Sequence, residues 1–80
     1  MVYVYILKSL NDSSYYIGIT KNINNRLAKH NKGGVYSTKY RKSLILIKSE
    51  VFENYAEARE REKKIKSFKG GNNFKKLINN

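Results

Sequence analysis

The chain has 80 residues, with 17 Lys or Arg against 6 Asp or Glu, so its formal net charge at pH 7 is +11. This length predicts one domain over residues 1–80. The absence of Cys excludes thiol catalysis and thiolate metal sites, and it fits a reducing compartment. No apolar run approaches the roughly 18–20 residues that span a bilayer, and no leader is recognisable, so we expect a soluble cytoplasmic protein.

The positive charge is unevenly distributed. No acidic residue lies between Asp12 and Glu50, and this stretch contains Lys21, Arg26, Lys29, Lys32, Lys39, Arg41 and Lys42. Such a field usually attracts a polyanion, nucleic acid first and an anionic membrane surface second. The competing interpretation is that the charge only maintains solubility.

A β-hairpin is predicted at the start of the chain. Val2–Leu7 and Tyr15–Thr20 are rich in β-branched and aromatic residues, and a polar turn at 10–13 separates them. This turn sets Tyr5 opposite Gly18. Side-chain alternation then gives one aliphatic face, expected to be core, with Val2, Val4, Ile6, Ile17 and Ile19. The other face is expected to hold Tyr3, Tyr5, Tyr16, Gly18 and Thr20.

Gly18 is unusual because glycine weakens the middle of a strand. A common reason for such a glycine is the close approach of a ligand or of another backbone. For Tyr5 and Tyr16 the competing interpretation is ordinary cross-strand aromatic packing.

A basic helix is predicted next. Asn22 is a suitable N-cap for a helix from Ile23 to about Asn31, which Gly33 and Gly34 end. At about 100° per residue, one face of this helix contains Ile23, Arg26, Leu27 and His30. The two basic side chains therefore face the protein body. The competing interpretation of His30 is a histidine at the core edge, satisfied by a backbone carbonyl.

A third strand is predicted over Leu44–Val51, after a basic loop at 32–42. A second helix begins with a capping sequence at 54–57 and runs to about Phe68. Its inner stripe is expected to contain Tyr55, Ala58, Glu62, Ile65 and Lys69. A short helix around Phe74, Leu77 and Ile78 closes the chain, and the predicted class is α+β.

Glu62 is the one acid in the apolar stripe of the second helix. Glu57 and Glu60 are placed for solvated pairs with Arg61 and Lys64, one turn away. An inward carboxylate and an inward arginine each need an opposite charge, from the protein or from a ligand. The competing interpretation is that Glu62 pairs with Arg26 or with a nearby lysine to stabilise the fold.

These residue types fit phosphodiester hydrolysis. A carboxylate can hold a divalent ion, an arginine can stabilise the charge on phosphorus, and a tyrosine or His30 can accept the proton of water. With a single inward glutamate we expect one ion, Mg²⁺ or Mn²⁺, that retains several waters. A tyrosine base requires that Arg, Lys or the ion lower its pKa.

The ordered motifs resemble those of the GIY-YIG nucleases. Tyr3-Val4-Tyr5 matches the first half, with Tyr3 in the place of its glycine, and Tyr16-Ile17-Gly18 matches the second. Arg26 with His30, and Glu62 within 61–66, match the motifs of the two helices. The likeness spans nearly the whole chain and is greatest to the small stand-alone bacterial members that resemble the excinuclease C subunit.

The resemblance implies a three-stranded antiparallel sheet flanked by helices, in the order β-β-α-β-α-α. It also implies that Tyr5 is the general base and that Tyr16 positions water or phosphate. Arg26 would stabilise the phosphorane, His30 would hydrogen-bond a tyrosine or the phosphate, and Glu62 would hold the metal. Asn72 and Asn73 are both left as candidates for an asparagine that assists the ion.

Residues of the basic surface are expected to contact nucleic acid. They are Gly18, Thr20, Lys21, Lys29, Lys32, Lys39, Arg41, Lys42 and Lys66.

The expected function is a metal-dependent DNA endonuclease, selective for structure or damage or targeted by a partner protein, with a role in DNA repair. RNA is the other candidate substrate, and a monomer that does not bind membranes is expected. The alternative is a non-catalytic nucleic-acid-binding module on the same fold. A membrane-surface protein ranks last, because neither long helix has a wide, bulky apolar face.

Overall fold

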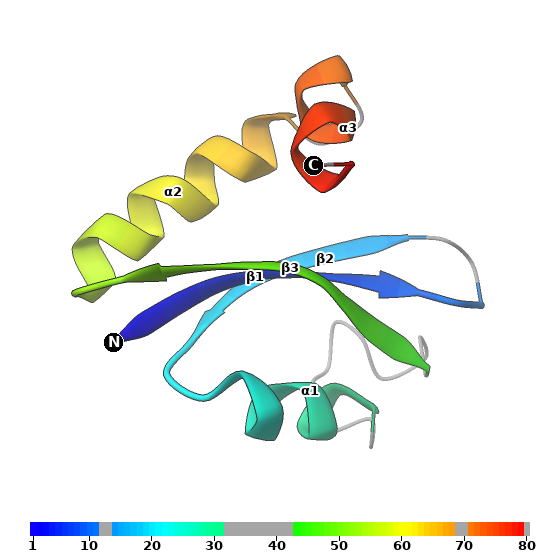
Figure 1. Ribbon diagram of the computed structural model, residues 1–80, viewed down its shortest axis with the longest axis horizontal. Helices are drawn as coiled ribbons and strands as arrows, with labels where there is room; N and C mark the ends of the chain where they lie inside the picture. Colours follow the sequence, from blue (N-terminus) through cyan, green and yellow to red (C-terminus); the bar gives the residue numbers. More distant parts are fainter. Residues whose placement is uncertain (12–13, 32–42, 69–70, 80) are drawn as a thin grey trace.

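The computed structural model describes residues 1–11, 14–31, 43–68 and 71–79. The elements are β1 (Val2–Ser9), β2 (Tyr15–Thr20), α1 (Ile23–Asn31), β3 (Leu44–Phe52), α2 (Tyr55–Phe68) and α3 (Asn72–Ile78). The strands form a three-stranded antiparallel sheet in the order β2-β1-β3. Helices α2 and α3 cover one face of this sheet and α1 lies on the other (Figure 1). The predicted α+β fold and element order are confirmed.

The hairpin register is the one that the sequence predicts. Tyr5 lies opposite Gly18, and Leu7 lies opposite Tyr16. Strand β1 continues to Ser9, beyond the predicted end at Leu7, because Leu44 of β3 pairs with Ser9. A register shift between Ile6 and Leu7 interrupts the pairing of β1 with β3.

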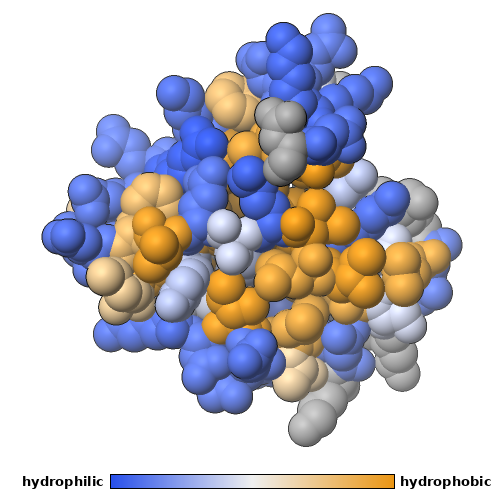
Figure 2. Space-filling model, viewed as in Figure 1, coloured by the Kyte–Doolittle hydropathy of each residue, from blue (hydrophilic) through white to orange (hydrophobic). Residues whose placement is uncertain are grey.

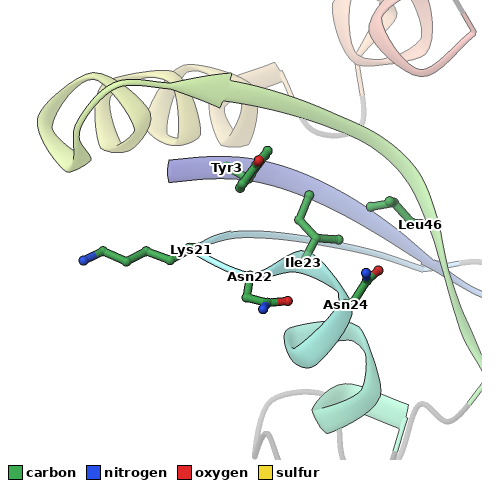
Figure 3. A pocket seen from close by; sticks show the side chains of 6 residues that line it. All are labelled: Tyr3, Lys21, Asn22, Ile23, Asn24 and Leu46. Carbon is green, nitrogen blue, oxygen red and sulfur yellow. The ribbon is translucent and has the colours of Figure 1, made fainter. Parts of the chain in front are cut away.

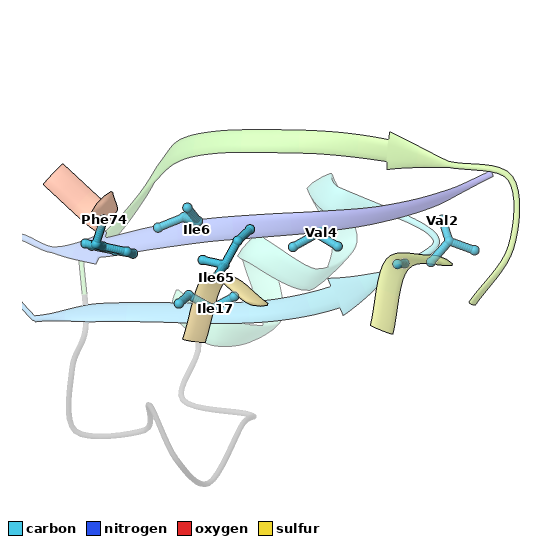
Figure 4. Packing of buried hydrophobic residues seen from close by; sticks show 7 residues of the cluster. Val2, Val4, Ile6, Ile17, Ile65 and Phe74 are labelled. Atoms are coloured by element: carbon cyan, nitrogen blue, oxygen red, sulfur yellow. The ribbon is translucent and has the colours of Figure 1, made fainter. Parts of the chain in front are cut away.

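Each face of the sheet packs a different kind of core. On the aliphatic face, side chains of β1 and β2 pack against α2 and α3 (Figure 4), in a cluster of Val2, Val4, Ile6, Ile17, Ala58, Ile65 and Phe74. On the other face, a smaller cluster contains Tyr5, Leu7 and Leu44, with Tyr16 and Leu27 packed against it. The face that the sequence marks as tyrosine-rich is therefore a second core, under α1.

Asparagine side chains cap both long helices. The Asn22 Oδ1 accepts a 3.0 Å hydrogen bond from the Asn25 N–H, and the Asn54 Oδ1 accepts one of 3.0 Å from the Glu57 N–H. Both predicted helix starts are confirmed. Caps of this kind stabilise a helix by about 1 kcal/mol.

Two contacts of α2 differ from the sequence expectation. Tyr55, expected on the inner stripe, is 45% exposed at the first residue of α2. Arg61 does not pair with Glu57: its Nε and Nη2 donate to the Glu50 carboxylate at 2.7 and 3.1 Å. The expected stripe residue Lys69 lies outside the described residues.

Strand β3 exposes apolar side chains at the edge of the sheet. Ile45, Leu46 and Val51 are 41%, 40% and 55% exposed, and Figure 2 shows hydrophobic side chains gathered over this strand. This strand contains the charged Lys48 and Glu50, and its pairing with β1 has a register shift. Charged side chains and irregular pairing commonly protect an edge strand against uncontrolled pairing. None of the helices in the described ranges is long and apolar enough to cross a membrane.

The Tyr5 side chain fills the space above Gly18. A Cβ atom at position 18 would lie 2.5 Å from the Tyr5 Oη and 2.7 Å from its Cζ. A glycine in mid-strand favours close approach of a ligand or of another backbone, and the structure corrects this expectation: the buried ring of Tyr5 occupies the space.

Gly18→Ala is expected to displace the Tyr5 ring and to lower the free energy of unfolding by about 1–3 kcal/mol, as overpacking of a core does. Urea denaturation of the two proteins measures the change. In a Tyr5→Phe background the clash with the hydroxyl is gone, so the same substitution should cost less. An equal cost in both backgrounds would show that the hydroxyl contact is not the cause.

Candidate active site

A pocket of about 510 Å³ opens at the outer edge of β2. Its lining consists of Tyr5, Tyr16, Ile19, Arg26, Tyr55, Arg59, Glu62, Lys63 and Lys66. Strand β2 is an edge strand, with α1 on one face of the sheet and α2 on the other (Figure 1). Side chains of both helices line the same opening. The structure thus brings together four of the five predicted catalytic residues, which lie far apart in the sequence.

The fifth residue, His30, lies behind Tyr5. It is fully buried, and its Nε2 is 3.2 Å from the Tyr5 Oη. Arg26 donates a hydrogen bond from Nε to the same oxygen at 3.2 Å. Since Arg26 supplies one proton to this oxygen, the Tyr5 hydroxyl is free to donate its own proton to His30 when the Nδ1–H tautomer is present. This matches the role that the resemblance implies for His30, a hydrogen bond to a tyrosine.

Three aromatic rings pack together below the pocket. The Tyr16 and His30 rings meet edge to face with their centroids 4.7 Å apart, and the Tyr5 and Tyr16 centroids are 6.3 Å apart. Cross-strand packing, the competing interpretation of the tyrosines, is therefore real. It holds the hydroxyl of Tyr5 in place beside Arg26.

Burial raises the pKa of Tyr5, and this effect outweighs the opposing hydrogen bond from Arg26. The nearby Tyr16 and Glu62 raise this pKa further, because a negative charge disfavours the phenolate. Arg26 by itself therefore does not meet the condition set for a tyrosine base, a pKa lowered by Arg, Lys or the ion. In turn, the hydrogen bond to Tyr5 raises the pKa of Arg26, so the guanidinium remains charged.

Glu62 is the sole acid among the described residues that line the pocket. Its side chain is 19% exposed, and its Oε2 lies 3.3 Å from the Nζ of Lys66, one turn along α2. Of the two competing pairings, the structure thus shows the one with a lysine. The Lys66 side chain is 54% exposed, and pairs of this kind contribute only about 0.3–0.5 kcal/mol, so the lysine is readily displaced.

The donor atoms of the pocket fit a hard divalent cation with few protein ligands. In the described part of the chain, no three His, Cys, Asp or Glu side chains are grouped closely enough to hold a metal ion. Glu62 would hold the ion through one carboxylate, with water and phosphate oxygens as the other ligands. That coordination suits Mg²⁺, which retains several waters.

Four residues of the pocket were not singled out for it from the sequence, and one of them, Ile19, was expected in the aliphatic core. Arg59 and Lys63 place two further cations at the opening, and Tyr55 forms part of its wall. The signal was present: Arg59, Lys63 and Lys66 lie one helical turn apart along α2, on the side that contains Glu62.

The residues expected to contact nucleic acid are dispersed. Lys66 lines the pocket, Lys21 has its Nζ 5.5 Å from the centre of the Tyr55 ring, and Lys29 is exposed on α1. Gly18 is buried beneath Tyr5, and the Thr20 hydroxyl bonds the backbone of the next turn. The remaining expected contacts lie outside the described residues: Lys32, Lys39, Arg41 and Lys42.

Asn72 and Asn73, the candidates to assist the ion, form the exposed start of α3. Neither residue lines the pocket.

Comparison with known proteins identifies the family. The sequence model of the GIY-YIG catalytic domain family matches residues 1–75. The chain belongs to the GIY-YIG family. This GIY-YIG chain also resembles small bacterial proteins that consist largely of the same domain, as the following matches show.

A UPF0213 protein of Staphylococcus haemolyticus is 45% identical over 67 residues, which are 82% of this chain and 80% of the relative. A UPF0213 protein of Staphylococcus saprophyticus is 43% identical over the same shares of both chains. The solution NMR structure of a UPF0213 protein from Bacillus halodurans superposes with a TM-score of 0.62 at 31% identity, covering 99% of this chain and 84% of the other.

Burial of Tyr5 predicts a loss of stability in alkali. The pKa of Tyr5 is higher in the folded than in the unfolded chain, so the unfolded chain releases this proton first as the pH rises. The contribution is therefore intact below about pH 10, the usual tyrosine pKa, and is lost above it. The free energy of unfolding should therefore fall as the pH rises above this value. Tyr5→Phe should reduce the slope of this fall by up to about 1.4 kcal/mol per pH unit.

Urea denaturation across this alkaline range measures the slope. Tyr55→Phe, which removes an exposed hydroxyl, is the matched control. A slope that changes equally in both variants would contradict the assignment to Tyr5.

Proposed function

We propose that this protein is a metal-dependent endonuclease that hydrolyses phosphodiester bonds of DNA with a single divalent ion, Mg²⁺ or Mn²⁺. The observation that supports it best is the shared pocket, in which Tyr5 with its Arg26 hydrogen bond and the Glu62 carboxylate face one opening. Membership of the GIY-YIG family makes nuclease chemistry the expected use of such a pocket.

The cations of the pocket place the scissile phosphate. Arg26 from α1 and Arg59, Lys63 and Lys66 from α2 surround the opening, so a phosphate binds between the two helices. Arg26 is fixed by its bond to Tyr5, and a preorganised guanidinium stabilises the charge that develops on the phosphoryl oxygens. Lys66 turns from Glu62 to the phosphate as the substrate enters.

Tyr5 accepts the proton of the attacking water and passes its own proton to His30. In the Nδ1–H tautomer of His30, the Tyr5 hydroxyl donates to Nε2 of the buried imidazole, which gives that proton a destination. Tyr16 packs against His30 and places its hydroxyl at the pocket, where it orients water or phosphate. A divalent ion at Glu62 would supply positive charge that acidifies nearby hydroxyl groups and neutralises the leaving oxygen.

The pocket favours recognition by shape rather than by sequence. Within the described residues, its polar lining consists of four cations, three tyrosines and Glu62. Cations of this kind contact phosphates, and phosphate contacts position a nucleic acid without reading its bases. We therefore propose selectivity for DNA structure or damage, or targeting by a partner protein, as in DNA repair. We further propose that the protein acts as a monomer in the cytoplasm.

Glu62→Gln is expected to reduce Mg²⁺-dependent nicking of DNA by at least about 100-fold, the scale typical for loss of a group that stabilises the transition state. The substitution removes the charge that holds the ion but preserves the shape, so DNA binding without metal should persist. Nicking of supercoiled plasmid and binding by anisotropy measure the two effects. Arg26→Ala should have a comparable effect on nicking.

Glu57→Gln is the matched control for Glu62→Gln. Glu57 lies on the same helix and is exposed, but it does not line the pocket, so its loss should leave nicking unchanged. Full nicking by folded Glu62→Gln protein would refute the assignment of Glu62.

A non-catalytic nucleic-acid-binding module is the second candidate. The raised pKa of Tyr5 and the ion pair at Glu62 favour it, because the first disfavours a phenolate base and the second occupies the carboxylate expected to hold the ion. On this alternative no divalent ion supports cleavage, and every folded variant retains only salt-sensitive binding.

Salt dependence should identify the phosphate contacts under either function. Lys63→Met and Lys66→Met are each expected to reduce the slope of log affinity against log salt by about 0.9 on duplex DNA. Lys76→Met, an exposed lysine of α3 outside the pocket, is the control. Equal slopes for all four proteins would show that phosphates do not enter this pocket.

A further inference from the structure

A second pocket, of about 450 Å³, lies on the α1 face of the sheet. It is lined by Tyr3 of β1, Leu46 of β3 and the residues at the start of α1 (Figure 3), which are Lys21, Asn22, Ile23 and Asn24. The catalytic role proposed above uses none of the side chains of this pocket, and among them only Lys21 was expected to contact nucleic acid.

The lining of this pocket is aromatic, aliphatic and amide. Tyr3 supplies an aromatic ring, Ile23 and Leu46 supply apolar surface, and two asparagines supply neutral donors and acceptors at the rim. Among the described residues that line this pocket, Lys21 is the only cation, and its side chain extends away from the other five (Figure 3), toward the Tyr55 ring. A pocket of this kind suits a flat, uncharged, hydrogen-bonding ring better than a phosphate.

The two pockets are neighbours. Tyr3 and Tyr5 are two residues apart in β1, so their side chains lie on the same face, about 7 Å apart along the strand. Lys21 lines the second pocket, and its Nζ lies over the ring of Tyr55, which lines the active-site pocket. A nucleic-acid strand whose phosphate occupies the active-site pocket therefore passes Lys21 and reaches Tyr3 with a base next to that phosphate.

We propose that this second pocket binds an unpaired nucleobase next to the scissile phosphate, stacked on Tyr3 against Ile23 and Leu46. The inference rests on the proposed function for its phosphate and adds the substrate class, a strand with at least one unstacked base. In the family motif the position of Tyr3 is a glycine, which has no side chain to stack.

The test combines abasic substitution with substitution of Tyr3. Single-stranded oligonucleotides, each with one abasic site at a different position, are titrated by anisotropy without divalent ion. For the unaltered protein, one position should weaken binding by about 5- to 100-fold, as expected for loss of one base stacked on an aromatic side chain. Tyr3→Leu should weaken binding of the intact strand by a similar factor, and the abasic site should then add little.

Matched variants separate stacking from folding. Tyr3→Phe retains the ring and should bind within about threefold of the unaltered protein. Leu46→Ala should weaken binding, whereas Ile45→Ala should not, because the two residues are 40% and 41% exposed on the same strand but only Leu46 lines the pocket. Parallel series in DNA and RNA identify which nucleic acid supplies the base.

An abasic penalty that is the same at every position in the unaltered protein and in Tyr3→Leu would overturn the inference. Nicking of DNA by the same proteins with Mg²⁺ distinguishes this failure from that of the proposed function. Nicking without coupling to Tyr3 refutes the base pocket alone. Coupling to Tyr3 without nicking under any divalent ion refutes the nuclease and retains the base pocket.

Discussion

The hydroxyl of Tyr5 is the contact on which the geometry of the site depends. Its ring lies over Gly18 of β2, its oxygen accepts a hydrogen bond from Arg26 of α1, and the buried His30 bonds it from the next turn of that helix. One side chain of the central strand thus fixes the edge strand and α1 relative to each other. A substitution that leaves a cavity at Tyr5 would lower the free energy of unfolding. It would also displace the Arg26 guanidinium, which lines the pocket.

The edge position of β2 explains how so small a domain assembles a site from both faces of its sheet. In the interior of a wide sheet, neighbouring strands would separate Arg26 on α1 from Glu62 on α2. Here the two helices pass the same edge, and their side chains meet beyond it. The opposite charges approach one pocket without forming a closed ion pair, since Arg26 bonds Tyr5 and Glu62 bonds Lys66.

Sequence reasoning succeeded where local rules determine the structure. The length of the hairpin turn gave the register of Tyr5 with Gly18, and asparagine caps gave both helix starts. It failed where a side chain is contacted or buried by an element that lies far away in the sequence. The pairing of Arg61 with Glu50 joins α2 to β3, and no helical spacing rule predicts a contact between separate elements. The pKa of Tyr5 likewise depends on how deeply α1 buries the ring, which the residue pattern does not reveal.

The location of the active-site pocket also limits how this sheet can grow. A further strand added beside β2 would cover Arg26 and Glu62 and close the opening. Within the described residues β3 pairs with β1 alone, so its outer edge is the side at which the sheet can be extended without loss of the site. An evolutionary insertion or a fused domain that lengthens this sheet is therefore restricted to the β3 side, and the two edges of one small sheet are subject to different selection.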